Sequence, residues 1–500
     1  MWTASNGKAR TDGMTVSQRY DVLIVGAGFG GLCMAAIAKT AGLRVVVLER
    51  RSEVGGTWSQ NTYPGCACDT QSHHYSLSFA LNPDWTQRYA PQPEILAYLK
   101  QVADDHDLTP SIRFGESVAS AVFDETTASW RVECEGGRSY QAQFVVSAVG
   151  QLNQPAVPKI PGMASFQGKT MHTAEWDHAY DFKGRTVAVI GNGASAIQLI
   201  PELAKSVRRL FIFQRSPNWL IPKLNRPFRP IEKSLLRHVP FLMRLYRWGI
   251  YWNWERSWPE FLVDSPQAKK RTGINRTGIE AAVRKADLRE KLIPTYPLGC
   301  KRILLSDDFL ETMQHEHVSL NTSGIARIER NEIVTNDGAR VAVDCIVYAT
   351  GFKSHDFLPR MNVVGRQRRS LKQDWDKAGG PNAYLGIAMP GYPNFFMTYG
   401  PNTNLGHNSI VFMLECQTRW ILKLILKARR QGKGTAEVTE AALAAFNRDL
   451  ERDLAKTAWA GSCSSWYKNA KGKIINNWSS STVRYWRLTR RVQTGDFNLT

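Results

Sequence analysis

Two side chains of opposite charge stand at equivalent points of two similar stretches of the sequence. Glu49 ends an apolar run that follows the glycine-rich turn GAGFGG, and Arg215 follows an apolar run downstream of the turn GNGASA. At the end of such a strand a carboxylate accepts hydrogen bonds from a ribose diol, whereas a guanidinium pairs with a ribose 2′-phosphate. The two stretches therefore predict two dinucleotide sites, the second selective for NADPH. The alternative for Arg215 is an exposed arginine that merely follows a strand.

The first turn lies between the apolar residues 22–25 and a helical stretch, the order of a buried parallel strand and the helix after it. Gly26 suits the tight turn, Gly28 lets a pyrophosphate approach the backbone, and Gly31 permits close packing of the helix. The phosphates would sit at the helix N-terminus, where free N–H groups and the helix dipole favour negative charge. With Glu49 at the end of the next strand, this stretch predicts a dinucleotide site of the FAD type.

The second turn has the GxGxxA form of the pattern, again between apolar runs. It comprises Gly191, Asn192, Gly193, Ala194, Ser195 and Ala196. The strand that follows leads into Gln214, Arg215 and Ser216, without the acid of the first stretch. One FAD site and one NADPH site in a single chain indicate hydride transfer from nicotinamide to flavin.

Length and composition bound the fold. A chain of 500 residues, 43% of them hydrophobic and without an obvious repeat, suggests two or three domains. We find no apolar run of about 18 residues or more, so a membrane span is not expected. The polar N-terminus lacks the apolar segment of a signal peptide, and Met14 is a possible true start. The scattered cysteines, Cys66 and Cys68 among them, favour reduced thiols in a cytoplasmic protein.

The net charge of +20 is unevenly distributed, with a basic excess in residues 221–290 and no acidic residue in 466–491. Such an excess attracts nucleic acid, anionic membrane surfaces or phosphorylated ligands. No nucleic-acid-binding motif is present, so no nucleic-acid partner is expected. A solvated basic face is the favoured interpretation, and attraction of polyphosphate cofactors is the next.

The stretch FQGKTMHTAEWD, residues 166–177, has no helical periodicity, and its lone histidine offers too few ligands for a metal. It fits the fingerprint F-x-G-x-x-x-H-x-x-x-W-[PD], at Phe166, Gly168, His172, Trp176 and Asp177. With the two dinucleotide turns, it makes the chain resemble the class B flavoprotein monooxygenases that use FAD and NADPH, and among them the Baeyer–Villiger monooxygenases. The fingerprint would be an interdomain linker, in which His172 couples conformations rather than transferring a proton.

The resemblance extends from Tyr20 to about Trp486 and implies an α/β fold with two Rossmann-like domains, for FAD and NADP, and a helical insertion. The FAD domain would take residues 1–152 and 384–500, and the NADP domain 153–222 and 296–383. The insertion, 223–295, has four tryptophans between 248 and 258, which could line a substrate route or touch a membrane. Burial in a helical core is the favoured alternative, and no obligatory membrane partner is expected. The oligomeric state, monomer or dimer, stays open.

The resemblance also implies a reaction. NADPH reduces FAD, O2 gives a C4a-peroxyflavin, and this species inserts oxygen next to a ketone carbonyl to form an ester or lactone. Arg302 would lie over the flavin and stabilise the negative charge on oxygen, since a guanidinium is permanently charged. Asp69 would pair with Arg302 and position it. Lys301 would join Arg215 at the 2′-phosphate, and Trp466 would close over NADP⁺ and substrate.

The residues expected at each cofactor form two sets. The FAD set is Gly26, Gly28, Gly30, Gly31, Glu49, Thr57, Trp58, Asp69, Tyr75, Val118 and Ile410. The NADP set is Gly191, Asn192, Gly193, Ala194, Ser195, Ala196, Gln198, Arg215, Ser216, Lys301, Arg302 and Trp466.

Three other functions stay as alternatives. An N- or S-oxygenating flavin monooxygenase has a similar fingerprint, but it typically ends in Tyr or Phe where this chain has Trp176. A flavin disulfide reductase would need a cysteine pair about five residues apart beside the flavin, which Cys66 and Cys68 do not provide. A non-enzymatic dinucleotide carrier would not need a second, NADPH-type turn.

Overall fold

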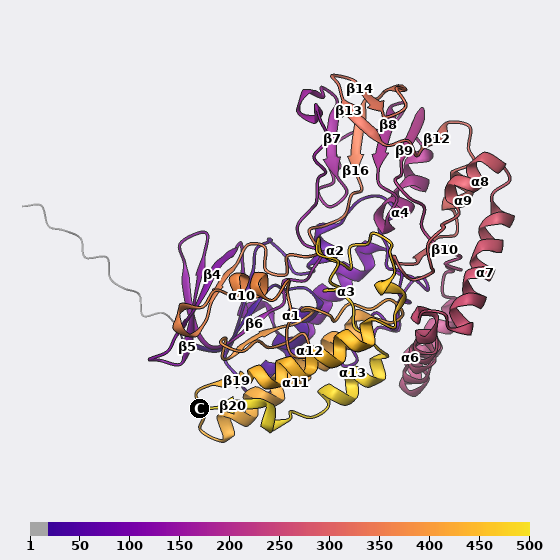
Figure 1. The fold of residues 1–500 in the computed structure, drawn as a ribbon. Coiled ribbons are helices and arrows are strands. Elements are labelled where there is room, and N and C mark those ends of the chain that lie inside the picture. The colour runs from indigo at the N-terminus through magenta and orange to yellow at the C-terminus, as the bar shows by residue number, and fades with distance from the viewer. Residues whose placement is uncertain (1–18) are drawn as a thin grey trace, which may run out of the picture.

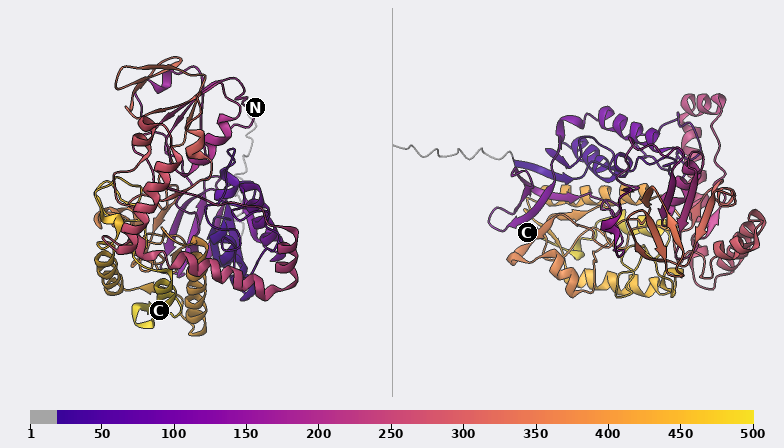
Figure 2. Two further views of the ribbon diagram at one scale, coloured as in Figure 1. Left: turned by 90° about the vertical axis from the view of Figure 1, so that its right-hand side faces the viewer. Right: turned by 90° about the horizontal axis from the view of Figure 1, so that it is seen from above.

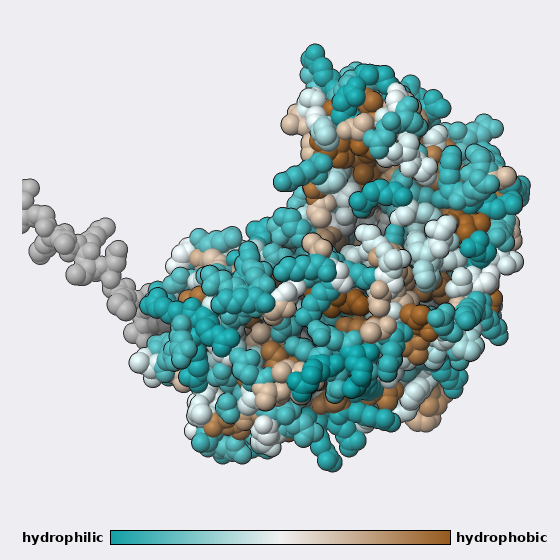
Figure 3. Space-filling view, in the orientation of Figure 1, coloured by the Kyte–Doolittle hydropathy of each residue, from teal (hydrophilic) through white to brown (hydrophobic). Residues whose placement is uncertain are grey.

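The computed structural model describes residues 19–500, and the N-terminal leader expected from the sequence lies outside them. Two lobes, each built on a largely parallel sheet, dominate the molecule (Figure 1). The lobe of the smaller sheet stands above that of the larger sheet, and the surface between them is hollowed on one side (Figure 3). The α/β fold class expected from the sequence is confirmed.

The larger sheet has eight strands within residues 19–500, in the order β17-β4-β5-β6-β1-β2-β3, with β18 also paired to β6. Strands β6, β1, β2 and β3 run parallel, whereas β4, β5 and β6 pair antiparallel. The strands are β1 (Arg19–Val25), β2 (Val45–Glu49), β3 (Ile112–Phe114), β4 (Val118–Asp124), β5 (Ser129–Cys134), β6 (Ser139–Ser147), β17 (Asn362–Val364) and β18 (Phe395–Met397). Helix α1 (Phe29–Thr40) packs against α11 (Ile410–Arg430), so the first and last parts of the chain share one core.

The smaller sheet is parallel throughout, in the order β12-β9-β8-β16-β7. Its strands are β7 (Lys169–His172), β8 (Thr186–Ile190), β9 (Arg209–Phe213), β12 (Val318–Asn321) and β16 (Cys345–Tyr348). Helix α4 (Ala194–Ala204) connects β8 to β9. A small antiparallel sheet of β13 (Ile325–Ile328), β14 (Glu332–Thr335) and β15 (Arg340–Ala342) precedes β16.

One strand lies outside the lobe that the expected boundaries assign to it. β17 falls within residues 296–383, yet it pairs with β4 of the larger sheet. We therefore propose that the chain returns to the larger-sheet lobe before residue 362, ahead of the expected boundary at 384.

The helical insertion forms the outer flank on the side of α6 and α7 (Figures 1 and 2). Its elements are α5 (Pro230–His238), α6 (Pro240–Glu255), a 3₁₀ turn (Trp258–Phe261), α7 (Pro266–Ala282) and α8 (Ala286–Leu292). Pro240 and Pro266 stand in the first turns of their helices, where the missing N–H costs nothing. Trp248 is 65% exposed and Trp252 42%, so these two are not core residues as the favoured interpretation expected.

The C-terminal segments pack beneath the larger sheet and then rise toward the lobe junction (Figure 1). They comprise α12 (Glu440–Leu454), α13 (Thr482–Thr489) and the antiparallel pair β19 (Ala436–Val438) and β20 (Phe497–Leu499). No helix within residues 19–500 is long and apolar enough to cross a bilayer.

The expectation of reduced thiols is wrong for one pair of cysteines. Cys300 and Cys463, which are 163 residues apart, form a disulfide. The other six cysteines are free and buried. A pair so distant in sequence has no spacing signature, because only the tertiary fold brings the two together.

Phe261 ties the insertion to the rest of the molecule. Its ring is 4% exposed and fills the space beside Gly299 and Gly406, where an added Cβ would come within 2.9 and 2.8 Å of it. Phe261→Ala should therefore destabilise the fold by about 3–5 kcal/mol, because it leaves a cavity. Phe241 of the same insertion is 66% exposed, and Phe241→Ala should change stability by less than about 0.5 kcal/mol. Denaturant unfolding of the two variants checks this, and equal losses would contradict the assigned packing.

Candidate active site

The first glycine-rich turn joins β1 to α1 with the close backbone approaches that the sequence predicts. Gly26 has φ +103°, and an added Cβ would come within 2.8 Å of the Ala148 carbonyl oxygen. At Gly31 an added Cβ would lie 1.8 Å from the carbonyl oxygen of Gly26, so only glycine fits. No side chain caps α1, and its first turn holds no acid. Its N-terminal N–H groups are thus available to an anion.

Glu49 stands at the end of β2, as predicted, and its carboxylate is buried. It accepts hydrogen bonds from the backbone N–H groups of Ala27 at 2.7 Å and Arg51 at 2.9 Å. The carboxylate therefore holds the turn and the strand end together, and its orientation is fixed. An oxygen of a fixed carboxylate has a further lone pair for a ribose hydroxyl.

A cavity runs from this turn along the carboxyl ends of the parallel strands and has about 1210 Å³ of empty space, part of it open to solvent. Of the predicted FAD residues, the cavity is lined by Gly26, Gly28, Gly30, Glu49, Thr57, Trp58, Tyr75, Val118 and Ile410. Gly31 lies behind the wall as a packing residue, and Asp69 is not part of the lining. The location and the lining residues match a site for an extended dinucleotide.

Several cavity residues were missed by the sequence analysis. They are Arg50, Arg51, Gln60, Leu358, Arg360, Met361, Thr398, Tyr399 and Leu414. Residues 358–361 precede β17 and belong to no glycine motif, so their position follows from the strand pairing alone. Thr398 and Tyr399 follow β18, whose pairing with β6 brings them to the cavity.

The second turn repeats the geometry between β8 and α4. Gly191 has φ +113° and lies so close to the Ala349 carbonyl that an added Cβ would be 2.4 Å from its oxygen. The space beside Gly193 is empty within 4 Å, and α4 has neither a side-chain cap nor an acid in its first turn. A phosphate-bearing ligand can therefore reach the helix N-terminus. Ala194, Ser195 and Ala196 form the first turn of α4.

A basic corner closes this second site at the end of β9. The amide of Asn192 donates to the Gln214 side chain and the Ser216 carbonyl, both at 2.8 Å. Lys301 donates to the Ser216 hydroxyl at 2.5 Å, and exposed Arg215 is near enough to act on Lys301 electrostatically. Burial and the Arg215 charge both lower the pKa of Lys301. The two cations thus lie close enough to repel each other, and an anion between them would relieve that repulsion.

The two lobes meet where the segment of residues 63–69 crosses α4. Gln198 accepts a hydrogen bond from the Tyr63 hydroxyl at 2.9 Å and donates to the Ala67 carbonyl at 3.0 Å. An added Cβ on Gly65 would lie 2.4 Å from the Gln198 carbonyl oxygen. Gln198, predicted as an NADP residue, therefore fixes the segment that carries Asp69.

Asp69 and Arg302 form an ion pair at this junction, with the Arg302 Nε donating at 3.1 Å and Nη2 at 2.5 Å to one carboxylate oxygen. Burial is the largest single influence on Asp69 and would raise its pKa, but the Arg302 charge, the Arg302 hydrogen bonds and the Lys223 charge together outweigh burial and lower the pKa. The Asp69 charge in turn raises the pKa of Arg302. Arg302 also acts electrostatically on Tyr399, a cavity residue, so a fixed positive charge lies near that end of the cavity.

The fingerprint residues gather around β7, away from the cavity. The Phe166 ring and the Asp344 carbonyl fill the space that a side chain at Gly168 would need. His172 is buried, accepts a hydrogen bond from the Ala174 N–H at 3.1 Å and has its pKa lowered by burial. Its ring meets Phe352 at 5.9 Å, in the segment that leads out of β16. None of these contacts lies at the cavity, so they do not indicate that His172 transfers a proton there.

Trp176 and Asp177 complete the fingerprint locally. The Trp176 ring stacks on Phe182 at 5.3 Å, and the Asp177 carboxylate pairs with Lys169 at 2.5 Å. The hydrogen bond from Lys169 lowers the pKa of Asp177. These contacts fix the chain between β7 and β8. Because both strands belong to the smaller sheet, this part of the fingerprint lies within one lobe, and the expectation of an interdomain linker is wrong for it.

Trp466 belongs to a C-terminal loop near Arg302. Its carbonyl accepts hydrogen bonds from His355 at 2.8 Å and from Asn476 at 2.6 Å. Its ring centroid lies 4.7 Å from that of buried Tyr467. Tyr467 is near enough to Arg302 for the guanidinium charge to act on its hydroxyl group. The structure thus brings Asp69, Arg302 and the Trp466 loop together between the two turns.

Two dinucleotide-type turns that meet at a partly buried guanidinium define an oxidoreductase with two nucleotide sites. The family described as pyridine nucleotide-disulphide oxidoreductase matches residues 23–239. A Baeyer–Villiger monooxygenase of Pseudomonas aeruginosa is 38% identical, covering 100% of this chain and 96% of that protein. One of Streptomyces coelicolor is also 38% identical, covering 97% and 93%. The chain belongs to the Baeyer–Villiger monooxygenase family.

Solved structures agree over nearly the whole chain. An oxidised steroid monooxygenase bound to NADP is 31% identical, with a TM-score of 0.86, covering 96% of this chain and 99% of that one. A closed cyclohexanone monooxygenase is 28% identical, with a TM-score of 0.86, covering 97% and 100%. An FAD-binding monooxygenase of Aspergillus niger is 40% identical in sequence, covering 96% of this chain and 82% of that protein. No cysteine lines the described cavity.

The Asp69–Arg302 pair predicts a pH signature. Asp69→Asn should lower the melting temperature at neutral pH, because it removes the counter-charge of a partly buried guanidinium. The folded pKa of Asp69 lies below the unfolded value of about 3.9. The contribution is therefore fully present above about pH 5 and is lost as pH falls through the folded pKa.

Melting curves of both proteins should thus differ by a constant amount from about pH 8 to about pH 5, and the difference should shrink in more acidic buffer. Asp84→Asn is the control, since Asp84 pairs with Arg237 at an exposed site, and exposed pairs contribute little. A difference that grows on acidification would contradict the assigned ion pair.

Proposed function

We propose that this protein is an FAD- and NADPH-dependent Baeyer–Villiger monooxygenase, which inserts one oxygen atom of O2 next to a ketone carbonyl and releases an ester or a lactone. The observation that carries the proposal is the Arg302 guanidinium, held by Asp69 where the two nucleotide sites meet. The 38% identity to proteins of that name over nearly the full chain supports the reaction class. Product analysis by mass spectrometry across linear, cyclic and aryl ketones tests it.

FAD fits the cavity beside the first glycine-rich turn. The uncapped N-terminus of α1 and the cavity-lining backbone of Gly28 suit the pyrophosphate, and the fixed carboxylate of Glu49 suits a ribose. The aromatic and apolar residues Trp58, Tyr75 and Ile410 suit a flat ring system at the far end. When bound and reduced, FAD supplies the chemistry that activates O2. The protein residues orient it and keep water out.

NADPH fits the second site. Its pyrophosphate would lie over the N-terminus of α4, where Gly193 leaves space. Arg215 and Lys301 would bind the 2′-phosphate, and the Ser216 hydroxyl that accepts from Lys301 orients the ammonium. A phosphate between the two cations would offset the repulsion that lowers the pKa of Lys301.

Arg302 would stabilise the negative charge that develops on oxygen during insertion. Its charge is permanent, and the Asp69 carboxylate holds the fork in one orientation before substrate arrives. Asp69 is thus a positioning residue. The Trp466 loop would cover the site and exclude water.

An N- or S-oxygenating activity is the second candidate function. The ion pair at Arg302 favours ketones, because nucleophilic attack on a carbonyl builds an oxyanion, whereas oxygen transfer to an amine or sulfide leaves no such charge on the substrate. Activity on amines without activity on ketones would reverse this order. For partners we propose a small ketone and O2, with no nucleic acid and no obligatory membrane partner, and a cytoplasmic location.

Cofactor choice gives the first test of the sites. Arg215→Ala should raise KM for NADPH about ten-fold or more, equivalent to about 1.4 kcal/mol, because one of two cations at the 2′-phosphate is removed. KM for NADH should stay almost unchanged, since NADH has no such phosphate. Steady-state kinetics with both cofactors check this, and equal losses with both would refute the assignment.

Arg302 gives the second test. Arg302→Ala should keep FAD bound, because the phosphate-binding turns are elsewhere. Ester or lactone formation should fall by about 10²-fold or more, the cost of a lost oxyanion donor. NADPH oxidation should continue slowly and release hydrogen peroxide.

Arg302→Lys is the matched variant, and it should recover part of the activity, since it keeps the charge but loses the planar fork. Product and peroxide are measured per NADPH consumed. If Arg302→Ala forms product at nearly the parental rate, Arg302 is a structural residue and another group carries the charge.

A further inference from the structure

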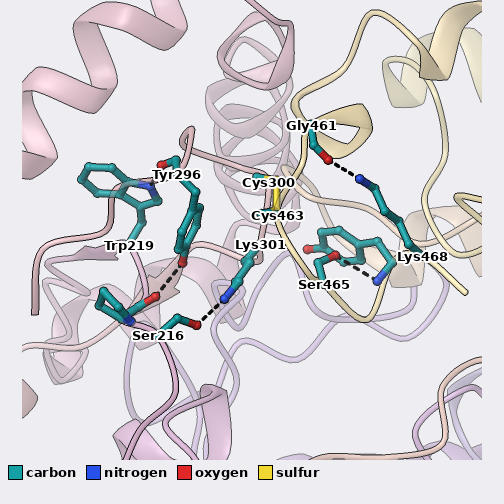
Figure 4. Close-up of a disulfide and its surroundings, with 11 residues drawn as sticks. Ser216, Trp219, Tyr296, Cys300, Lys301, Gly461, Cys463, Ser465 and Lys468 are labelled. Carbon is teal, nitrogen blue, oxygen red and sulfur yellow. Dashed lines mark hydrogen bonds between the residues drawn. A yellow bond between two sulfur atoms is a disulfide. The ribbon is translucent and has the colours of Figure 1, made fainter. Parts of the chain in front are cut away.

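The Cys300–Cys463 disulfide lies between the two segments that would form the oxygenating centre. Figure 4 shows it between the turn that carries Lys301 and the C-terminal loop that carries Ser465 and Lys468. On one side, Cys300 directly precedes the Lys301–Arg302 pair. On the other side, Cys463 comes three residues before Trp466. The cross-link therefore connects the guanidinium segment to the covering loop.

The Cys300 side is rigid. Cys300 is fully buried, and its N–H donates to the Pro297 carbonyl at 3.2 Å. The preceding Gly299 has φ +82° and packs on Phe261. Lys301 and Arg302 are then fixed by Ser216 and Asp69. This turn holds its position without help from the loop.

The Cys463 side depends on the disulfide. Ser462, Cys463 and Ser464 make no hydrogen bond to the part of the chain that the structure describes. The later part of the loop is anchored: Lys468 donates to the Gly461 carbonyl, and the Trp466 carbonyl accepts from His355 and Asn476. The disulfide is thus the anchor of residues 462–464, the stretch that leads into Trp466.

We propose that Cys300 and Cys463 are a redox-active pair whose disulfide positions the Trp466 loop over Arg302, so that oxidation improves the yield of oxygenated product per NADPH. This inference rests on the proposed function. When residues 462–464 lose this anchor, water enters the site beside Trp466, and NADPH is then spent on hydrogen peroxide. The two cysteines are positioning residues, since they act through Arg302 and Trp466.

The closing reaction uses hydrogen peroxide as oxidant. The Cys463 thiolate attacks one peroxide oxygen, the O–O bond breaks, and the resulting sulfenic acid accompanies one released water. The Cys300 thiol then attacks the Cys463 sulfur, the S–S bond forms and a second water leaves. Two thiols are oxidised by two electrons, and one peroxide is reduced to two waters. A reducing dithiol or phosphine reverses the cross-link by attack on sulfur.

Cys463 is the accessible member of the pair. It is half-buried in the loop, whereas Cys300 and the six free cysteines are buried. Burial also raises the pKa of the Cys66, Cys68 and Cys134 thiols to about 12, which keeps them unreactive. Peroxide released by an open site would therefore react first at Cys463 and close the loop that had released it.

The experiment uses the full chain loaded with FAD. One sample is oxidised with hydrogen peroxide that catalase then removes, and another is reduced with a phosphine that is removed by desalting. The mass of the intact protein shows whether the cross-link has formed, because two hydrogens are lost when it forms. Hydrogen peroxide and ester or lactone are measured per NADPH, well below the melting temperature. Cys463→Ser cannot form the disulfide and therefore reproduces the reduced state permanently. Cys134→Ser, far away on β5, is the matched control.

Reduction and Cys463→Ser should each raise peroxide released per product about ten-fold, and the phosphine should not change Cys463→Ser further. Cys134→Ser should behave like the parent in both states. The proposal is overturned if the oxidised, reduced and Cys463→Ser proteins release the same amount of peroxide per product. It is also overturned if they differ only in melting temperature. If the parent makes no ester or lactone in either state, the proposed function fails instead, and the masses still report whether the cross-link forms.

Discussion

The Asp69–Arg302 ion pair is the constraint on which the rest of the site depends. Asp69 follows the first nucleotide framework and Arg302 belongs to the second, so the pair can form only when the two lobes are correctly apposed. A partly buried ion pair is costly to desolvate, and its attraction repays that cost only with good geometry. Gln198, which binds Tyr63 and Ala67, supplies this geometry from α4. The Asp69–Arg302 ion pair is therefore present only when the two lobes are packed together.

Local sequence patterns predicted the parts of the fold that short-range physics determines. Gly26, Gly31 and Gly191 are required by backbone contacts a few residues or one strand away, and they stand where the pattern placed them. Glu49 and Ser216 follow their strands for the same reason. The Arg302–Asp69 pairing came from family resemblance, since nothing in the spacing of two residues so far apart predicts a contact. The geometry of the pair agrees with that expectation, whereas its catalytic role stays a proposal.

The features that sequence reasoning missed are those that long-range packing decides. Tyr399 and Arg360 reach the cavity because β18 pairs with β6 and β17 pairs with β4 in the larger sheet. The Cys300–Cys463 disulfide depends on the path of the C-terminal loop back across the junction. The exposed tryptophans of α6 were expected in a core because aromatic density suggests burial. The number of aromatic residues in a segment does not show which face of its helix packs against a neighbouring element.

Charge arrangement distinguishes the two nucleotide sites more sharply than backbone shape does. Both turns offer an uncapped helix N-terminus, so each accepts a pyrophosphate. At the first site the buried Glu49 carboxylate would repel a 2′-phosphate, whereas at the second Lys301 and Arg215 repel each other until an anion lies between them. Since Lys301 adjoins Arg302 in the chain, a nucleotide that binds Lys301 also steadies the turn that carries the guanidinium. Nucleotide binding and the electrostatics of the oxygenating centre are therefore coupled through two consecutive residues.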